Sequence, residues 1–430
     1  MPSRDKPEPT GASAAGFARY HRPALLTVAL VLAAFNLRPA LSSVGPLLDE
    51  LRGGLGMSSA VAGVLTALPP AGFALAGAAA PRLTRRFGPD TALVVGMGLL
   101  SVGVLVRAFV GNTPSFLLLS ALAVSGIGIS NVVMPVVVRH YFPDRIGFMT
   151  GVYSTALMIG AASATAISVP IADSFGHSWR SGLGFWAVPA GLALAVWLPG
   201  HRARHRADLD RRDGGAPVAG DALATDGPLF RDRSVWILTV FFGLQSAGAY
   251  IVFGWLPQIL RDAGVAAGTA GVLVALTPAV GIPFAFVLPG YAVRTHREGL
   301  IAAVLSGLGL VGYAGLWLAP AAAPWAWTII TGISQSVFPV ALAMIGVRAS
   351  SAPAAAARLS AFVQGFGYLI AMPAPLIVGL LNEHTGGWNW PLAFMAALLV
   401  PQLVCGYLAG RRTSAESRPA PAARSSRPAR

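Results

Sequence analysis

Cysteine is almost absent from this sequence. Cys405 is the single cysteine among 430 residues, so no disulfide can form within the chain and no metal site can be built from cysteines. The seven histidines include no close pair inside an apolar stretch. A paired nucleophile and base, of the kind an enzyme would need, is also missing. The sequence therefore predicts no metal, no cofactor and no catalytic residues.

Charged residues are scarce as well. They make up 11% of the chain, against 55% hydrophobic residues, whereas soluble domains carry roughly 25% charged residues. The apolar residues form runs near the length of about 20 that a membrane helix needs. These runs are too long for barrel strands and lack strict alternation. We expect an all-α membrane protein with spans at 23–48, 58–80, 90–110, 114–138, 146–171, 181–199, 234–259, 267–290, 299–319, 324–347, 359–381 and 389–409.

Acidic residues are missing from the deep part of every predicted span. Asp49 and Glu50 come nearest, at the mouth of the first span. A proton relay through membrane-embedded carboxylates is therefore excluded. If transport is coupled to protons, either the proton travels with the solute or the anion alone neutralises the intramembrane Arg38. Uniport and exchange stay open.

Positive charge is plentiful, with a net charge of +14, and it is unevenly distributed. When the N-terminus is placed inside, the outward loops hold only Arg52, Arg107, Arg180 and Arg261, apart from the intramembrane Arg38. Lys and Arg collect in cytoplasmic loops, so we expect both termini in the cytoplasm and the protein in the inner or plasma membrane. The charge then reflects topology and contact with anionic lipid, and no nucleic-acid partner is expected.

The two halves of the chain repeat each other. The run AGVLTALPPA at Ala62–Ala71 returns as AGVLVALTPA at Ala270–Ala279, and GISNVVMPV at Gly128–Val136 returns as GISQSVFPV at Gly332–Val340. A parallel repeat of two six-helix halves is one architecture of secondary transporters.

The repeat and the composition together define five segments. We expect a cytoplasmic tail at 1–22, the first half at 23–199, a cytoplasmic linker at 200–233, the second half at 234–409 and a disordered cytoplasmic tail at 410–430. The first tail lacks a convincing cleavage site, so it is retained rather than removed as a signal peptide. The last tail is of low complexity.

The loop after the second span resembles the loop signature of the major facilitator superfamily. It reads GAAAPRLTRR from Gly77 to Arg86, with Pro81 in place of the usual acidic residue and Thr84 in place of the second glycine. The segments AFNLRPALSSVGPLL and GISNVVMPVVVRHYFPDRIGFMTGVYSTAL resemble the cyanate and 2-nitroimidazole transporter branch. The resemblance implies alternating access, with a cavity lined by spans one, four, seven and ten.

Arg38 is the candidate that stands out. It lies inside the first span, where a charge costs at least about 2.5–3.5 kcal/mol, so either it faces a cavity and binds an anion or it snorkels to the nearer surface. Ser246 takes the equivalent place in the second half. The site would then carry one positive charge, which favours a monovalent anion or a polarised neutral solute.

Asn36 lies almost opposite Arg38 on an ideal helix, so the two cannot bind one ligand unless the helix is distorted. Pro39 could distort it, because proline removes the hydrogen bond to the Phe35 carbonyl. We expect Asn36 to make an interhelical hydrogen bond.

Polar residues on other spans complete the predicted binding site. They share a position inside a span and a hydrogen-bonding side chain, and the alternative for each is packing or a bond between helices. They are Asn131, Gln245, Gln335, Tyr153 and Gln364.

Charged residues at the cytoplasmic ends of the spans form a predicted gate, whose contacts would be exchanged when the halves rock. The alternative interpretation is that these charges only reflect the membrane topology and take no part in gating. They are Arg82, Arg85, Arg86, Asp144, Arg145 and Arg294.

The sequence thus predicts a monomeric transporter, secondary active or facilitative, of a small anionic or polarised solute. The resemblance implies that this solute is cyanate-like or a nitro-heterocycle. The alternative is efflux of amphipathic drugs through a cavity lined by Phe241, Phe242, Phe362 and Phe366, with Arg38 structural. A membrane sensor or scaffold is more remote, because no segment has the composition of a folded soluble domain.

Overall fold

The computed structural model describes residues 23–211, 227–348 and 353–416, and the regular elements in these ranges are all helical. The described residues contain twelve helical stretches long and apolar enough to cross a membrane, which confirms the predicted number of spans. The predicted N-terminal tail, residues 212–226 of the predicted linker and residues 417–430 of the predicted C-terminal tail lie outside the described residues.

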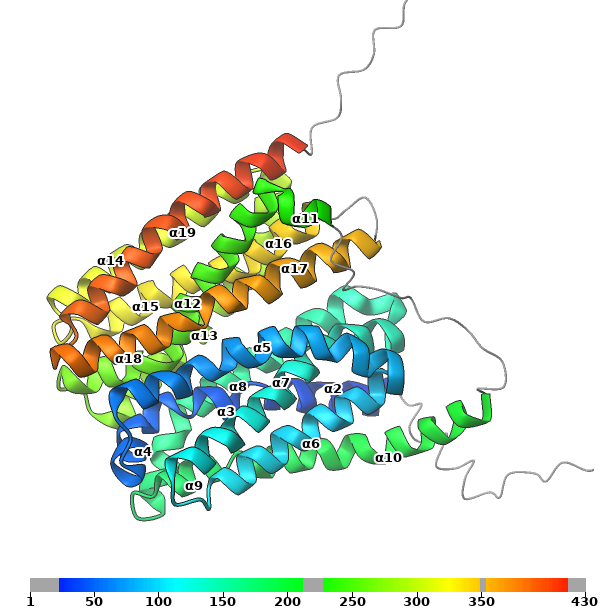
Figure 1. The fold of residues 1–430 in the computed structure, drawn as a ribbon, viewed down its shortest axis with the longest axis horizontal. Coiled ribbons are helices and arrows are strands. Elements are labelled where there is room, and N and C mark those ends of the chain that lie inside the picture. The colour runs from blue at the N-terminus through cyan, green and yellow to red at the C-terminus, as the bar shows by residue number, and fades with distance from the viewer. Residues whose placement is uncertain (1–22, 212–226, 349–352, 417–430) are drawn as a thin grey trace, which may run out of the picture.

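The first half of the chain supplies six of these stretches, drawn blue to green in Figure 1. The first stretch is broken into four short elements. In chain order the elements are α2 (Pro23–Asn36), α3 (Pro39–Ser42), η1 (Gly45–Leu47), α4 (Leu48–Leu55), α5 (Ser59–Phe87), α6 (Pro89–Arg107), α7 (Thr113–Tyr141), η2 (Pro143–Arg145), α8 (Ile146–Ser174), α9 (Trp179–Gly184) and α10 (Ala187–Arg211).

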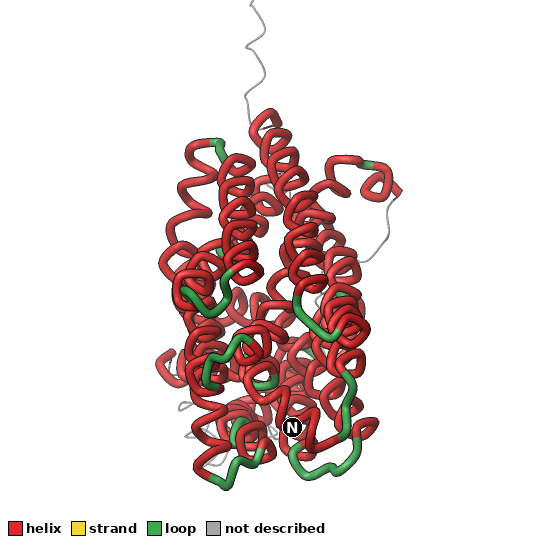
Figure 2. Tube along the Cα trace, turned by 90° about the vertical axis from the view of Figure 1, so that its left-hand side faces the viewer, coloured by secondary structure: helices red, strands yellow, loops and turns green. Residues whose placement is uncertain are grey.

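The second half forms the other bundle, drawn green to red and lying beside the first in Figure 1. Its fourth and fifth stretches are each broken once. The elements are α11 (Gly227–Arg231), α12 (Arg233–Asp262), α13 (Ala267–Thr295), α14 (Glu298–Leu318), α15 (Pro324–Gln335), α16 (Val337–Arg348), α17 (Pro353–Ala371), α18 (Pro373–Thr385) and α19 (Asn389–Glu416). Figure 2 shows that short loops join most of these helices.

Several helices extend past the span ends that the sequence predicts, and two of them run well into the segments predicted as linker and tail. Helix α10 continues to Arg211, into the predicted linker, and α19 continues to Glu416, into the predicted tail. Residues 201–211 contain neither Gly nor Pro, so nothing in that stretch stops a helix. We call the end of the bundle where α10 ends and α12 begins the linker end, and the opposite end the far end.

The two halves share one hydrophobic core at the far end. Leu51 and Leu65 of the first half pack in one cluster with Trp255, Leu256 and Val378 of the second half. Toward the linker end the clusters separate, because one is built mainly around α2, α6 and α7 and another around α12, α16 and α17. The halves are thus held together most firmly at the far end.

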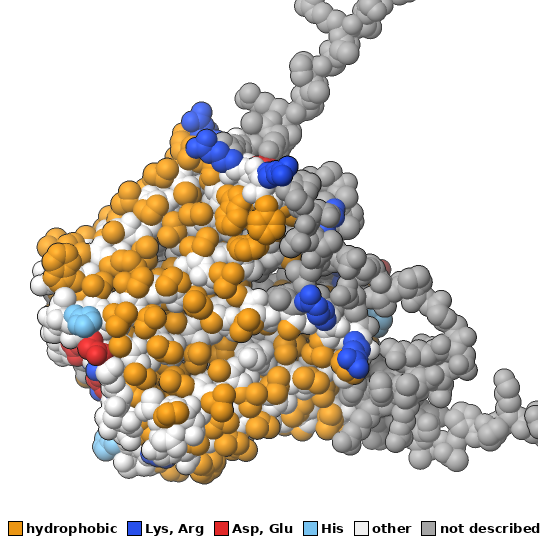
Figure 3. Space-filling model, in the orientation of Figure 1, with side chains coloured by type: hydrophobic (Ala, Val, Ile, Leu, Met, Phe, Trp, Pro, Cys, Tyr) orange, Lys and Arg blue, Asp and Glu red, His pale blue; other side chains and the backbone are white. Residues whose placement is uncertain are grey.

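The surface of the bundle is apolar. Leu75 is 70% exposed, Leu118 72% and Leu318 82%, which would be costly in water but suits a lipid environment. Figure 3 shows hydrophobic side chains across the visible face, with Lys and Arg at the linker end and a few acidic and His side chains at the far end. This distribution agrees with a membrane-embedded bundle.

The break in the first span places Arg38. Helix α2 ends at Asn36, and Arg38 is the residue before α3, with φ −116° and ψ −38°. Proline has no N–H to donate, so Pro39 leaves the Phe35 carbonyl without its helical partner. That carbonyl packs against Gly160 of α8, where a Cβ would overlap the Phe35 oxygen. A glycine at 160 therefore lets α8 support the break.

We predict that Gly160→Ala destabilises the protein by about 1–3 kcal/mol, the usual cost of overpacking, and lowers its unfolding temperature in detergent. Gly191→Ala is the control, because a Cβ at that helical position meets nothing within 4 Å and alanine favours helix over glycine. Equal unfolding temperatures for Gly160→Ala and wild type would show that α8 does not support the break.

Candidate functional site

A cavity of about 40 Å³ lies next to the broken first span. A cavity needs roughly 10–15 Å³ on this measure to hold one water molecule, so this one suits a solute of a few heavy atoms. The lining comes from the first span and from α5, α6, α7 and α12. The residues are Arg38, Ala40, Leu41, Ser42, Val44, Leu65, Thr66, Leu68, Pro69, Arg107, Ser120, Val124, Tyr250, Phe253 and Gly254.

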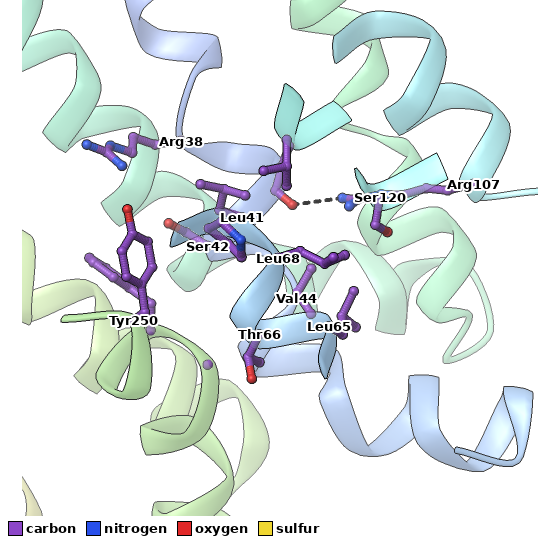
Figure 4. A pocket seen from close by; sticks show the side chains of 15 residues that line it. Arg38, Leu41, Ser42, Val44, Leu65, Thr66, Leu68, Arg107, Ser120 and Tyr250 are labelled. Carbon is purple, nitrogen blue, oxygen red and sulfur yellow. Dashed lines mark hydrogen bonds between the residues drawn. The ribbon is translucent and has the colours of Figure 1, made fainter. Parts of the chain in front are cut away.

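Arg38 lines the cavity, half-buried, as the sequence suggests. Its guanidinium lies close enough to Tyr250 of α12 and Tyr368 of α17 to interact electrostatically with both. Figure 4 shows the Tyr250 hydroxyl pointing toward it. The two tyrosine rings lie 6.4 Å apart, and both pack against Phe73 of α5. Arg38 therefore lies where side chains of the two halves meet.

The polar groups of the cavity favour an anion. Ser42, Thr66 and Ser120 add hydroxyls to the guanidinium and the phenol, and none of the described lining residues is Asp or Glu. Thr66 already donates to backbone carbonyls of its own helix, at 3.1 Å to Ala62 and 3.0 Å to Gly63. The remaining donors can bind a negative charge, and no lining carboxylate competes for them.

Arg107 is the functional candidate that sequence reasoning misses. It ends α6 and counts as a loop residue in the sequence, yet its side chain turns into the bundle and is 1% exposed. Its Nη2 donates to the Ala40 carbonyl at 2.9 Å, the dashed line in Figure 4. The prediction of a site with one positive charge is therefore wrong, because two arginines line the cavity.

Asn36 makes the interhelical bond that the sequence predicts. Its Nδ2 donates to the Pro189 carbonyl of α10 at 3.0 Å and to the Leu32 carbonyl of its own helix at 2.8 Å. The side chain is 2% exposed and does not line the cavity. Asn36 thus fixes α2 against α10.

The other predicted binding residues lie outside the cavity. Gln245 is buried on α12, where its Nε2 donates to Ser246 Oγ at 2.7 Å and to the Phe242 carbonyl at 3.1 Å. Gln364 of α17 donates to Ser360 Oγ at 2.7 Å on the same helix. The rest are half-buried on three other helices. They are Asn131 on α7, Gln335 at the end of α15 and Tyr153 on α8.

The helices that line the cavity are only partly those that the family resemblance implies. Spans one, four and seven contribute, as the resemblance implies, and so do spans two and three, through α5 and α6. Span ten, formed by α15 and α16, contributes none of the lining residues. The cavity thus lies mostly within the first half, with α12 as its wall from the second half.

The predicted gate residues all lie at the linker end. Arg82, Arg86, Asp144, Arg145 and Arg294 are exposed there. The remaining one, Arg85, lies in the last turns of α5.

A salt bridge joins the halves at the far end. Arg261 of α12 donates from Nη1 and Nη2 to the two carboxylate oxygens of Glu50, at 3.0 and 2.9 Å. It also donates to the Pro46 carbonyl at 3.2 Å and lies 3.6 Å from Asp49. This bidentate pair, beside the shared core, closes the cavity toward the far end.

A second link joins α5 to α18 at the same end. Ser59 Oγ donates to Asn382 Oδ1 at 3.0 Å, and the Ala60 backbone N–H donates to Glu383 Oε2 at 2.6 Å. Both acceptors belong to the second half. Together with Arg261, these bonds hold the far end closed.

Sequence comparison identifies the class of protein to which this fold and cavity belong. Residues 26–371 match the family model described as Major Facilitator Superfamily. The chain belongs to the major facilitator superfamily, whose members are transporters and not enzymes. It is a multi-pass membrane transporter.

Named relatives lie in the branch that the sequence resembles. The chain is 33% identical to the 2-nitroimidazole transporter of Escherichia coli strain K12, over 90% of this chain and 95% of that protein. It is 34% identical to the cyanate transport protein CynX of the same organism, over 88% and 95%. Among solved structures, the nucleoside transporter NupG shares the fold, with a TM-score of 0.69, 12% identity and coverage of 90% and 98%.

We predict that Asn36→Ala lowers stability and leaves solute binding intact, because Asn36 bonds α10 and not the cavity. Interhelical hydrogen bonds in membranes contribute about 0.6 kcal/mol on average and up to about 1.7. Thermal unfolding in detergent gives the loss, and solute titration of the same sample gives the affinity. An affinity that falls while the unfolding temperature holds would assign Asn36 to the ligand.

Proposed function

We propose that the protein moves a small anion or a small polarised solute across the membrane by alternating access, with Arg38 as the positive determinant. The observation that carries this proposal is Arg38 itself. It lines the cavity at the break of the first span, where Tyr250 also faces the cavity and no lining carboxylate neutralises the charge. An anion is the natural partner for such a group.

The size of the cavity supports a very small solute. About 40 Å³ holds roughly three water molecules, which is close to a linear triatomic anion such as cyanate. A nitro-heterocycle would need the cavity to widen. The named relatives transport cyanate and 2-nitroimidazole, so both belong in the test.

The remaining predicted residues have places in this mechanism. We propose that Asn131, Gln245, Gln335, Tyr153 and Gln364 orient the solute in conformations other than this one. We propose that the charged cluster at the linker end, Arg82 to Arg86 with Asp144, Arg145 and Arg294, closes that end when the far end opens. We propose that the linker end faces the cytoplasm and that both termini lie on that side, because Lys and Arg collect on the cytoplasmic side of membrane proteins.

The alternative of drug efflux receives less support. Phe241 and Phe242 are fully buried in the core of the second half. Phe362 and Phe366 stack on each other and on Trp236 near the linker end, with ring centroids 4.7 to 5.6 Å apart. None of the four lines the cavity, so they are packing residues in this conformation.

We predict that Arg38→Ala folds and inserts but transports poorly. A hydrogen bond to a charged group contributes about 1.5–3 kcal/mol, so the apparent affinity for the anion should fall on the order of ten- to hundredfold. Uptake of labelled cyanate and of labelled 2-nitroimidazole into liposomes holding the purified protein measures the loss. Arg38→Lys keeps the charge and should retain part of the uptake of cyanate.

Two results would contradict this proposal. Normal uptake by Arg38→Ala would remove the role of Arg38. Thermal stabilisation of wild type by lipophilic cations alone, with no response to small anions or nitro-heterocycles, would favour the efflux alternative instead.

We predict that Arg261→Gln loosens the far end. The Arg261–Glu50 pair is half-buried, with 19% and 29% of the two side chains exposed. An ion pair near the protein surface contributes about 1 kcal/mol, so opening should become about fivefold more frequent. The readout is labelling of Thr66→Cys by a membrane-impermeant thiol reagent applied at the far end, in a chain whose Cys405 is replaced by Ala. Thr66 is 7% exposed and lines the cavity.

The matched control is Arg180→Gln. Arg180 also lies at the far end, but it donates to the Val110 carbonyl at 3.0 Å and stacks on Trp179, all within the first half. Its loss should leave labelling unchanged. Equal labelling of Arg261→Gln and wild type would show that the salt bridge does not hold the far end closed.

A further inference from the structure

Arg107 is a second cation in the cavity whose bonding is incomplete. Its Nη2 donates to the Ala40 carbonyl, while its Nε has no hydrogen-bond partner. Among the described residues, no carboxylate forms an ion pair with it. A buried charge is costly unless it is paired. The position therefore has room for a negative partner that the chain itself does not supply.

Ser120 is the second group at this place. It is 1% exposed, lines the same cavity, and its hydroxyl has no hydrogen-bond partner. The guanidinium carbon of Arg107 lies 5.9 Å from the ring centroid of Phe116. Phe116 and Ser120 are four residues apart on α7, hence on one face. Figure 4 accordingly shows Ser120 beside the end of the Arg107 side chain.

We propose that Arg107 and Ser120 form a second anion-binding position in the cavity, separate from Arg38. The transported anion occupies this second position on its way between Arg38 and the far end. The inference rests on the proposed function in one respect, that the cavity carries an anion. Arg107 ends α6 on the far-end side, and the lining residues Val44 and Leu65 belong to the shared far-end core. The position thus lies between Arg38 and the closed end.

A purely structural role explains less. In a regular helix the Val44 N–H would donate to Ala40, but here it donates to Leu41 at 3.3 Å, so Arg107 takes over as donor to the Ala40 carbonyl. This capping uses Nη2 alone. The cation–π contact with Phe116 uses the face of the guanidinium, at the outer limit of about 6 Å for such contacts. Neither contact gives Nε a hydrogen-bond acceptor, and neither explains the Ser120 hydroxyl.

Thiocyanate, a linear triatomic anion, is a suitable probe for both positions. Its stabilisation of the purified full-length protein against heat is measured for wild type, Arg38→Gln, Arg107→Gln and the double variant. We expect Arg38→Gln to keep a weaker response and the double variant to lose it. Arg107→Lys should respond more strongly than Arg107→Gln, because the charge remains.

Ser120→Ala is the decisive variant, because removing an unpaired buried hydroxyl should not impair folding. We expect its unfolding temperature without anion to match or exceed that of wild type, and its apparent Kd for thiocyanate to rise about fivefold or more. Ser125→Ala is the control, since Ser125 of α7 bonds to Ala121 at 2.8 Å and lies outside the cavity.

The results separate this inference from the proposed function. Wild-type affinity for thiocyanate in both Ser120→Ala and Arg107→Gln would leave Arg107 a capping residue and overturn the second position. If Arg107→Gln does not fold, Ser120→Ala alone decides. Normal uptake by Arg38→Ala, together with weakened thiocyanate binding by Ser120→Ala, would remove the proposed role of Arg38 and leave the second position standing.

Discussion

The missing N–H of Pro39 is the constraint from which the candidate site follows. Because Pro39 cannot donate to Phe35, α2 ends at Asn36 and the chain restarts at α3. Asn36 and Arg38 already face opposite sides of a regular helix, and the break keeps them apart. Asn36 therefore bonds α10, while Arg38 lines the cavity. Beyond α3 the Val44 N–H donates to Leu41 rather than to Ala40, and the side chain of Arg107 donates to the Ala40 carbonyl instead. Interrupted helices near ligand sites are a recurrent device of transporters.

Charge balance in the cavity supports the proposal that Arg38 meets an anionic solute. In lipid, a guanidinium without a carboxylate is costly, and the lining of the cavity supplies hydroxyls and a phenol but no described acid. The acids that do exist near the first span, Asp49 and Glu50, are occupied by Arg261 at the far end. Negative charge is therefore used to join the halves, and positive charge is left available in the cavity.

The sequence predicts the fold well and the site only in part. Span number and the repeat follow from apolar run length and from two pairs of matching segments, both of which are local properties. Arg38 can be picked out from the sequence alone, because it is a charged residue inside an apolar run. Arg107 is missed because it ends a helix, and only packing shows that its side chain turns inward to Ala40. Gln245 illustrates the opposite error, since an intramembrane amide can bond its own helix instead of a ligand.

The position of the cavity explains how one small solute could be handled in steps. The two halves share a core and a bidentate salt bridge at the far end, so the cavity is closed there. The halves have separate cores toward the linker end, where Arg82, Arg86, Asp144, Arg145 and Arg294 are exposed. Two arginines at different places in one cavity would let an anion leave one cation only as it approaches the other. A cavity with a single deep cation would hold the anion more firmly and release it more slowly, because release would leave that charge unpaired.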